Sequence, residues 1–331
     1  MTVTSTPVAQ RAKVGWGDLL WLTWRQHRWQ LGGVALAVGG VTLACLVIAW
    51  VTDATGTYQH DFLFLGGFNG ASQLASIASI AFGGLIAVFW AAPLLSREYE
   101  QKTSVVVWTQ DITPTRWLVG KMVLLGVPAV GLAAALGSAV RTGQNAMNSA
   151  REDYFPYRPF ESAVFESAPL LQIGYAAFGF ALGLAVSAIT RRTVLSMGLT
   201  LGLFIAVRMA VGVVWRPYFQ TPLRRIQPYD SPRGFGGPRV PDDLTMYVAS
   251  GYMDAAGNEI EFPRVCGTRS YDTADGFVDC LRGHGVVNTF TDYQPVERLV
   301  PFQLFEFAVF GLLAAGLLTL THLWVRRSHR F

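Results

Sequence analysis

The chain has 331 residues, of which 51% are hydrophobic and only 15% are charged, and its formal net charge is +4. In soluble globular proteins about a quarter of the residues are charged, so this composition disfavours a soluble protein. The basic residues gather beside apolar runs, which makes the net charge a signal of membrane orientation and speaks against a nucleic-acid partner.

Six apolar runs are long enough to cross a membrane, since a spanning helix needs about 20 mostly apolar residues. They are Leu31–Val51, Ser72–Leu95, Trp117–Val140, Pro169–Ile189, Val194–Trp215 and Pro301–Val325. One uncharged run could be a buried helix of a soluble protein, but six in one chain predict a multi-pass membrane protein. The first run exceeds the apolar part of a signal peptide and lacks a small-residue cleavage site, so we expect a retained span.

The residues before the first run, 1–30, are expected on the cytoplasmic side. Within them, Gly15–Gln30 alternates aromatic and basic residues at helical spacing, and its apolar members include Trp16, Trp24 and Trp29. This pattern favours a helix that lies in the membrane interface. It also fits the start of the first span.

Lys and Arg residues in short loops predict the orientation, because they remain mostly on the cytoplasmic side. On the side of the N-terminus, the flanks contain Arg11, Lys13, Arg25, Arg28, Arg97, Lys102, Arg116, Lys121, Arg191, Arg192, Arg326, Arg327 and Arg330. The short loops on the other side contain only Arg141, Arg151 and Arg158. We therefore predict that both termini are cytoplasmic.

The segment Ser96–Lys121, between the second and third runs, is more polar than a simple reversal of the chain requires. It contains four basic residues, three acidic residues and Pro114. We interpret it as a hairpin made of a short amphipathic helix, a turn and a second basic anchor. Such a hairpin at the membrane face would provide a docking surface; the alternative is an ordinary basic inner loop.

Two charged residues lie inside the apolar runs. Arg208 is seven residues before Trp215, where the fifth run ends, and Glu306 is five residues after Pro301, where the sixth begins. At 1.5 Å per residue, both lie roughly 8–10 Å below the outer surface. A charge in the membrane needs a partner or an aqueous cavity, so we predict an ion pair between them. The alternative is that each side chain reaches the outer head groups separately.

Small residues recur at a spacing of four in two runs. Gly179 and Gly183 lie in the fourth run, and Gly198 and Gly202 lie in the fifth. Such pairs allow neighbouring helices to approach closely.

The long loop Arg216–Val300 is expected to be a small extracellular domain. It begins with a stretch rich in Pro, Gly and Arg, a composition that resists helix and sheet interior. Short strand-like runs follow at Leu244–Ala249, Glu259–Phe262, Phe277–Leu281 and Val286–Phe290. Cys266 and Cys280 both fall in this loop, so in an oxidising compartment we expect a disulfide between them, with two free thiols as the alternative.

Motifs for catalysis or energy conversion are missing from the sequence. Gly120-Lys121 is followed by Met122 and position 115 is Thr, so this is not a phosphate-binding loop. No zinc-binding His motif or nucleophile elbow occurs either. We therefore expect neither an enzyme nor a resident cofactor or metal, and any uphill transport would need energy from a partner.

The hairpin and its flanking spans resemble the permease subunits of bacterial ABC exporters of the type-2 class. In that family, this connection reads as an acid, several residues, Thr, an apolar stretch, Pro-x-x-Arg, and Gly-Lys at the start of the next span. The counterparts here are Glu98, Glu100, Thr103, Val105–Trp108, Pro114, Arg116 and Gly120-Lys121. The family usually has Gly just before the Thr, where this chain has Lys102.

The resemblance implies that the hairpin couples the spans to a separate ATP-binding cassette ATPase, which would hold ATP and magnesium. The implied coupling residues are Arg97, Glu98, Glu100, Thr103, Pro114, Arg116 and Lys121. It further implies a second permease copy or a paralogue as partner, a bacterial plasma membrane, and export of a hydrophobic or amphipathic compound. An alternative of another class is a membrane sensor or scaffold whose extracellular domain binds a ligand.

Together these observations predict an all-α membrane protein. Six transmembrane helices follow an N-terminal interfacial helix, and a small irregular, β-containing extracellular domain lies between spans five and six. The divisions are 1–30 for the cytoplasmic N-terminus and interfacial helix, 31–215 for spans one to five with the hairpin at 96–121, 216–300 for the extracellular domain, and 301–331 for the sixth span and basic tail.

Overall fold

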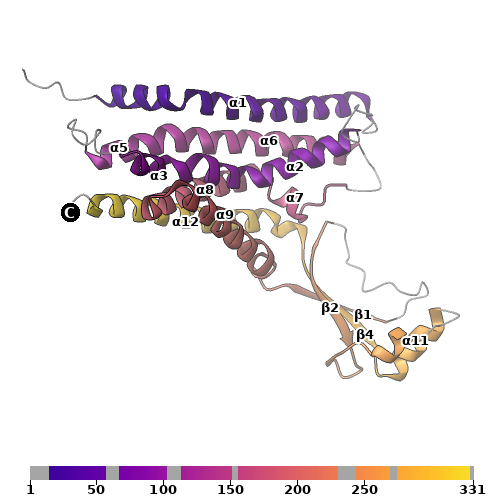
Figure 1. Ribbon diagram of the computed structural model, residues 1–331. Coiled ribbons are helices and arrows are strands. Elements are labelled where there is room, and N and C mark those ends of the chain that lie inside the picture. Colours follow the sequence, from indigo (N-terminus) through magenta and orange to yellow (C-terminus); the bar gives the residue numbers. More distant parts are fainter. Residues whose placement is uncertain are drawn as a thin grey trace, which may run out of the picture.

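The computed structural model describes residues 15–56, 67–102, 113–150, 156–229, 244–268 and 274–328. Within these ranges, six helical segments are long and apolar enough to cross a membrane, which confirms the six predicted spans. They cover Trp16–Thr55, Gly70–Glu100, Thr115–Ser149, Pro169–Thr190, Thr193–Tyr218 and Val296–Arg327. The structure is thus mostly helical, with a small antiparallel sheet between spans five and six (Figure 1).

Three of the spans contain a π-helical turn, a local widening that is common at functional sites. Span two consists of α2 (Gly67–Leu85), the π-helix η1 (Ile86–Ala91) and α3 (Ala92–Glu100), and span three of α5 (Pro114–Lys121), the π-helix η2 (Met122–Gly126) and α6 (Val127–Ser149). Span five consists of α9 (Thr193–Met209), the π-helix η3 (Ala210–Trp215) and the 3-10 turn η4 (Arg216–Tyr218). Span four is α8 (Pro169–Thr190), and span six is the 3-10 turn η5 (Val296–Arg298) with α12 (Leu299–Ser328).

The first span corrects one expectation, because no separate interfacial helix forms. A single helix, α1, runs from Trp16 to Thr55 over 40 residues. The sequence contains no proline near Gln30 that would break it, and Gly32 and Gly33 are tolerated inside a helix. At 1.5 Å per residue, α1 is about 60 Å long, twice the hydrocarbon thickness, so a long part of it extends beyond the hydrocarbon.

Helix α8 lies at the centre of the bundle, where most of its side chains are buried. It packs against spans two, three, five and six. Its glycines allow span two to come close, since a Cβ added at Gly179 would lie 2.5 Å from the carbonyl oxygen of Gly83, and one at Gly183 would lie 2.6 Å from that of Ala87. The close contact predicted for this pair is confirmed.

The glycine pair of α9 behaves differently. An added Cβ at Gly198 or Gly202 would meet nothing within 4 Å among the described residues. Large apolar side chains on the same helix, Leu199, Leu203 and Ile205, are also exposed. This face of α9 therefore makes no close helix contact within the described chain.

The described residues of the sheet domain form four strands and two short helices. In chain order they are β1 (Leu223–Pro228), β2 (Met246–Met253), β3 (Glu259–Ile260), α10 (Arg264–Thr268), α11 (Ala274–Gly283) and β4 (Asn288–Gln294). All strands are antiparallel in the order β1-β4-β2-β3, with an irregularity in β2 between Tyr247 and Ala249. The predicted strand runs near 244, 259 and 286 overlap β2, β3 and β4.

One prediction for this domain is wrong. The run Phe277–Leu281 lies in helix α11, because its apolar residues form one helical face that is buried in the domain core with Cys266. Strand β1 lies in the stretch whose composition was expected to resist the interior of a sheet, and its place at the edge is compatible with that expectation. It forms because it is an edge strand, where Pro228 at the end need not donate a ladder hydrogen bond.

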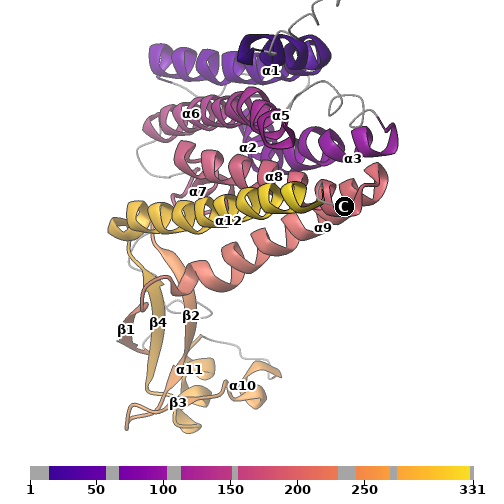
Figure 2. The ribbon, with the colours of Figure 1, turned by 90° about the vertical axis from the view of Figure 1, so that its left-hand side faces the viewer.

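The sheet domain extends from one end of the helical bundle (Figure 2). The beginning of α1, the end of α12 and the α3–α5 region all lie at the opposite end (Figure 1). We call the two ends of the bundle the sheet end and the α3 end. Because the number of spans is even, both ends of the described helical region lie at the α3 end.

Candidate coupling junction and intramembrane ion network

At the α3 end, a buried ion pair joins spans two and three. The ammonium group of Lys121, the last residue of α5, donates to the carboxylate of Glu98 in α3. The Lys121 side chain is only 3% exposed, and its Nζ lies 4.6 Å from the centre of the Trp117 ring. A cation so removed from water needs a partner, and Glu98 supplies the compensating charge.

A second contact joins span three to span one. The guanidinium of Arg116 lies 4.9 Å from the centre of the Trp16 ring at the start of α1. Helix α5 begins with Pro114 at its first position, and the Thr113 hydroxyl accepts the backbone N–H of Arg116 at 3.4 Å. This capping fixes the direction in which Arg116 leaves the helix.

A third contact joins span two to span five. The carboxylate of Glu100, the last residue of α3, accepts the backbone N–H of Thr193 at 2.9 Å and its hydroxyl at 2.6 Å. Thr193 opens α9, where an acidic group is favourable because the N–H groups there lack helical partners. We call Glu98, Glu100, Arg116 and Lys121 the junction, since together they connect the predicted hairpin to spans one, three and five.

The structure describes some of the remaining predicted coupling residues and not others. Arg97 is exposed and forms no ion pair within the described ranges. Thr103 lies outside the described residues. Lys102 has a φ of 54°, a left-handed conformation that glycine adopts without strain and other residues do not. The glycine that the resemblance leads us to expect at this position would adopt this conformation without strain.

At the sheet end, a buried arginine binds two carboxylates. Arg216 in η4 donates from Nε to Glu306 Oε2 at 2.8 Å, and from Nη2 to Glu306 Oε1 and Glu166 Oε1 at 2.9 Å each. The Arg216 and Glu306 side chains are 3% and 1% exposed. The guanidinium also lies 4.3 Å from the centre of the Phe165 ring.

Arg208 belongs to the same network, but its ion-pair partner is not Glu306, which lies at a similar depth in the sequence-based prediction. It forms an ion pair with the other oxygen of Glu166. Its guanidinium carbon lies 3.5 Å from the centre of the Tyr175 ring, whose hydroxyl donates to Glu306. The expected direct pair of Arg208 with Glu306 is therefore replaced by an ion network of Arg208, Glu166, Arg216, Glu306 and Tyr175.

Sequence reasoning missed two members of this network. Glu166 lies just before the fourth apolar run, and Arg216 lies just after the fifth, so the hydropathy pattern places both in loops. With them, two guanidinium groups face two carboxylates, and the formal charges cancel. This balance makes burial of four ions tolerable, because each has a hydrogen-bonded partner of opposite charge.

The sheet domain contains the predicted disulfide. Cys266 in α10 and Cys280 in α11 are bonded and 14 residues apart in the sequence. His284 Nδ1 lies 3.7 and 3.9 Å from the two sulfur atoms. A metal would need free thiolates, so this cluster is not a metal site while the disulfide is intact.

An exposed ion cluster fixes the edge strand of the sheet. Arg224 in β1 donates to both oxygens of Asp292 at 2.8 Å and to Glu259 at 2.6 Å. Hydrogen bonds to these two carboxylates raise the pKa of Arg224 above its already high value. The guanidinium also covers the Phe290 ring, at 4.0 Å from its centre. Bidentate pairs of this kind set the direction of both partners.

Comparison with known families identifies the helical region. Residues 53–216 match the model of a family described as "ABC-2 membrane transporter related". The match runs from the end of α1 to the end of span five and includes the junction residues. This region belongs to that family, so the resemblance to a type-2 ABC permease is confirmed and the chain is a multi-pass membrane component of a transporter. No curated protein matches the chain.

Proposed function

We propose that this protein is the permease subunit of an ATP-driven exporter in a bacterial plasma membrane. The spans would form the translocation path, and a separate ATP-binding cassette ATPase would bind ATP and magnesium. The family match carries this proposal. The basic flanks support cytoplasmic termini, and the α3 end would then face the ATPase.

The junction gives the proposed coupling a physical basis. A hairpin that transmits force must be fixed firmly to the spans that it moves. Glu98 and Lys121 connect its two arms, Arg116 reaches α1, and Glu100 holds the first turn of α9. A displacement at the hairpin would therefore reach spans one, three and five together.

The exposed faces of the bundle support a dimer, with a second copy or a paralogue. An apolar groove of about 520 Å³ lies between span two and span five, with Phe89 on its wall and Arg208 and Glu166 at its polar part. The neighbouring face of α9 carries Gly198 and Gly202, which allow close helix contact. We infer that two such grooves face each other and guide a hydrophobic or amphipathic compound.

The test is co-purification in mild detergent with candidate ATPase subunits of the source cell. Wild type should retain an ATPase and support coupled ATP hydrolysis, whereas Glu98→Ala and Arg116→Ala should lower either association or hydrolysis. Glu261→Gln, an exposed acid of the sheet domain, serves as the matched control. If no ATPase associates with a folded wild-type protein, or if the control is equally impaired, the coupling role is wrong.

A ligand sensor is the second candidate, and one cavity favours it. A polar hollow of about 580 Å³ lies between residues 156–161 and the start of β2, with Arg158, Glu161 and Tyr247 on its wall. The sheet domain is held to the spans through Gln294, whose amide donates to the carbonyl oxygens of Pro217 and Gln220. ATP-dependent movement of a compound in vesicles would decide for the exporter, and ligand-dependent ATP hydrolysis without movement would decide for the sensor.

A further inference from the structure

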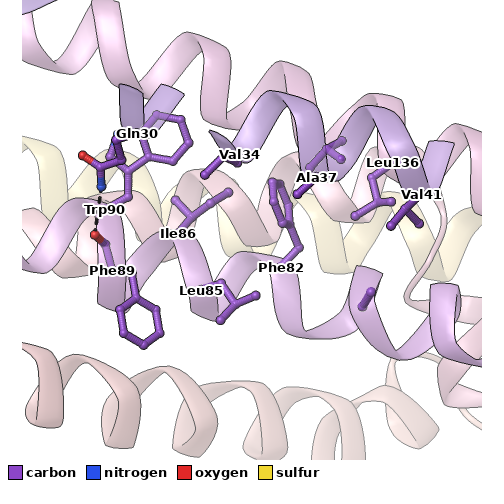
Figure 3. Close-up of a pocket in the computed structure, with 12 residues that line it drawn as sticks. Gln30, Val34, Ala37, Val41, Phe82, Leu85, Ile86, Phe89, Trp90 and Leu136 are labelled. Carbon is purple, nitrogen blue, oxygen red and sulfur yellow. Dashed lines mark hydrogen bonds between the residues drawn. The ribbon is translucent and has the colours of Figure 1, made fainter. Parts of the chain in front are cut away.

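An apolar groove runs between α1 and span two on the outside of the bundle. Its volume is about 350 Å³. Val34, Ala37 and Val41 of α1 line it together with Phe82 and Ile86 of span two and Leu136 of α6 (Figure 3). The polar side chain on its wall, Gln30, already donates from Nε2 to the carbonyl oxygen of Phe89 at 3.1 Å. This section therefore suits a hydrocarbon chain.

The groove continues into a polar hollow toward the α3 end. This hollow has a volume of about 460 Å³, and it shares Gln30, Phe89 and Trp90 with the apolar section, so the two are contiguous. The other polar side chains on its wall are Gln26, His27, Arg97, Glu98 and Gln101. One continuous surface thus changes from apolar to polar along α1.

The charge of the hollow favours an anion. Arg97 is exposed and forms no ion pair with any described residue. The acidic side chain on the wall, Glu98, is bound to Lys121. The hollow therefore offers one guanidinium to a ligand, and its carboxylate is already neutralised.

The length of the apolar section matches one leaflet of a membrane. Gln30 and Val41 are eleven residues apart, or about 17 Å along a helix. Half of the hydrocarbon core of a bilayer is about 15 Å. An acyl chain in this section would place its head group beside Gln30 and Arg97.

We propose that the groove between α1 and span two binds one anionic phospholipid from the leaflet at the α3 end. An acyl chain lies along Val34, Ala37 and Val41, and the phosphate group lies in the hollow near Arg97. A second copy of the chain is a poorer occupant, because an apolar helix would leave Arg97 and the neighbouring amides without partners. This site does not depend on the proposed exporter function.

The test uses the full-length protein, reconstituted in equal amounts of phosphatidylglycerol and phosphatidylcholine with identical acyl chains. Native mass spectrometry after extraction should show one retained lipid per chain, with phosphatidylglycerol preferred about tenfold, or about 1.4 kcal/mol. Ala37→Phe fills the groove and should lower the occupancy about tenfold. Leu36→Phe adds an aromatic ring at the next residue, which is 79% exposed, and should retain the wild-type occupancy.

Arg97→Gln tests the head group without changing the packing, since this side chain is exposed. It should preserve the total occupancy and abolish the preference for phosphatidylglycerol. The proposal is overturned if Ala37→Phe and Leu36→Phe behave alike while both elute as single folded species, or if Arg97→Gln leaves the preference unchanged. Oxidative cross-linking between two Val34→Cys chains in a Cys45→Ala background would also overturn it, because a second copy would then fill the groove.

Discussion

Removing one charge from the intramembrane network should destabilise the folded protein more than removing one positive and one negative charge together. Glu306→Gln keeps the shape of the side chain and an acceptor for Tyr175, but it leaves Arg208 and Arg216 with Glu166 as their sole carboxylate in the network. The network then has a net charge of +1 at a site where the Arg216 side chain is 3% exposed. In the double variant with Arg216→Met, the remaining Arg208–Glu166 pair is neutral.

The magnitude follows from the cost of an uncompensated buried charge. Removing one partner of a buried ion pair costs about 3–5 kcal/mol. An unfolding entropy of about 2.1 cal/mol/K per residue gives roughly 0.7 kcal/mol/K for 331 residues, so each kcal/mol shifts the melting temperature by about 1.4 °C. Glu306→Gln should therefore lower the melting temperature by about 4–7 °C.

The assay is thermal unfolding in one detergent for wild type, both single variants and the double variant. We expect the double variant to melt at least 3 °C above the sum of the two single effects, a coupling of about 2 kcal/mol. Glu161→Gln, an exposed acid at the same end, should shift the transition by less than about 1 °C. Additive single effects, or a Glu306→Gln protein that melts like wild type, would refute the buried network.

Three further predictions concern local geometry. Lys102→Gly should raise stability by about 1 kcal/mol in the same melting assay, because it removes the strain of a left-handed backbone conformation. Its control, Gln101→Gly, lies at a right-handed position and should lower stability by roughly 0.5–1 kcal/mol. Gly183→Val should destabilise by more than about 3 kcal/mol, since its Cβ would meet backbone atoms of span two. Gly131→Val, at an exposed position of α6 where an added Cβ would meet no described atom within 4 Å, should leave the melting temperature unchanged. Cys266→Ser, or a reducing agent, should cost the sheet domain about 3 kcal/mol for a 14-residue separation, measured as faster proteolysis there than in the bundle.

The spans could be predicted because the bilayer imposes a length. A run of about 20 apolar residues has few other uses, and all six runs correspond to helices. The disulfide between Cys266 and Cys280 could be predicted for a related reason, since two cysteines in one small domain have few other possible pairings. The separate interfacial helix at Gly15–Gln30 could not be distinguished from a long first span, because amphipathic spacing is the same in both cases.

The depth of a charged residue in the membrane does not predict which partner it binds. Arg208 and Glu306 both contact Tyr175, but depth says nothing about the direction in which a side chain leaves its helix. A signal for Arg216 was nevertheless present in the sequence. It follows Arg208 by eight residues, about two helical turns, so the two guanidinium groups lie on nearly the same side of span five. Two cations on one side require two anions, and Glu306 supplies only one. Charge balance alone therefore called for a second acid near the sheet end, and Glu166, three residues before Pro169, is at the right place in the chain.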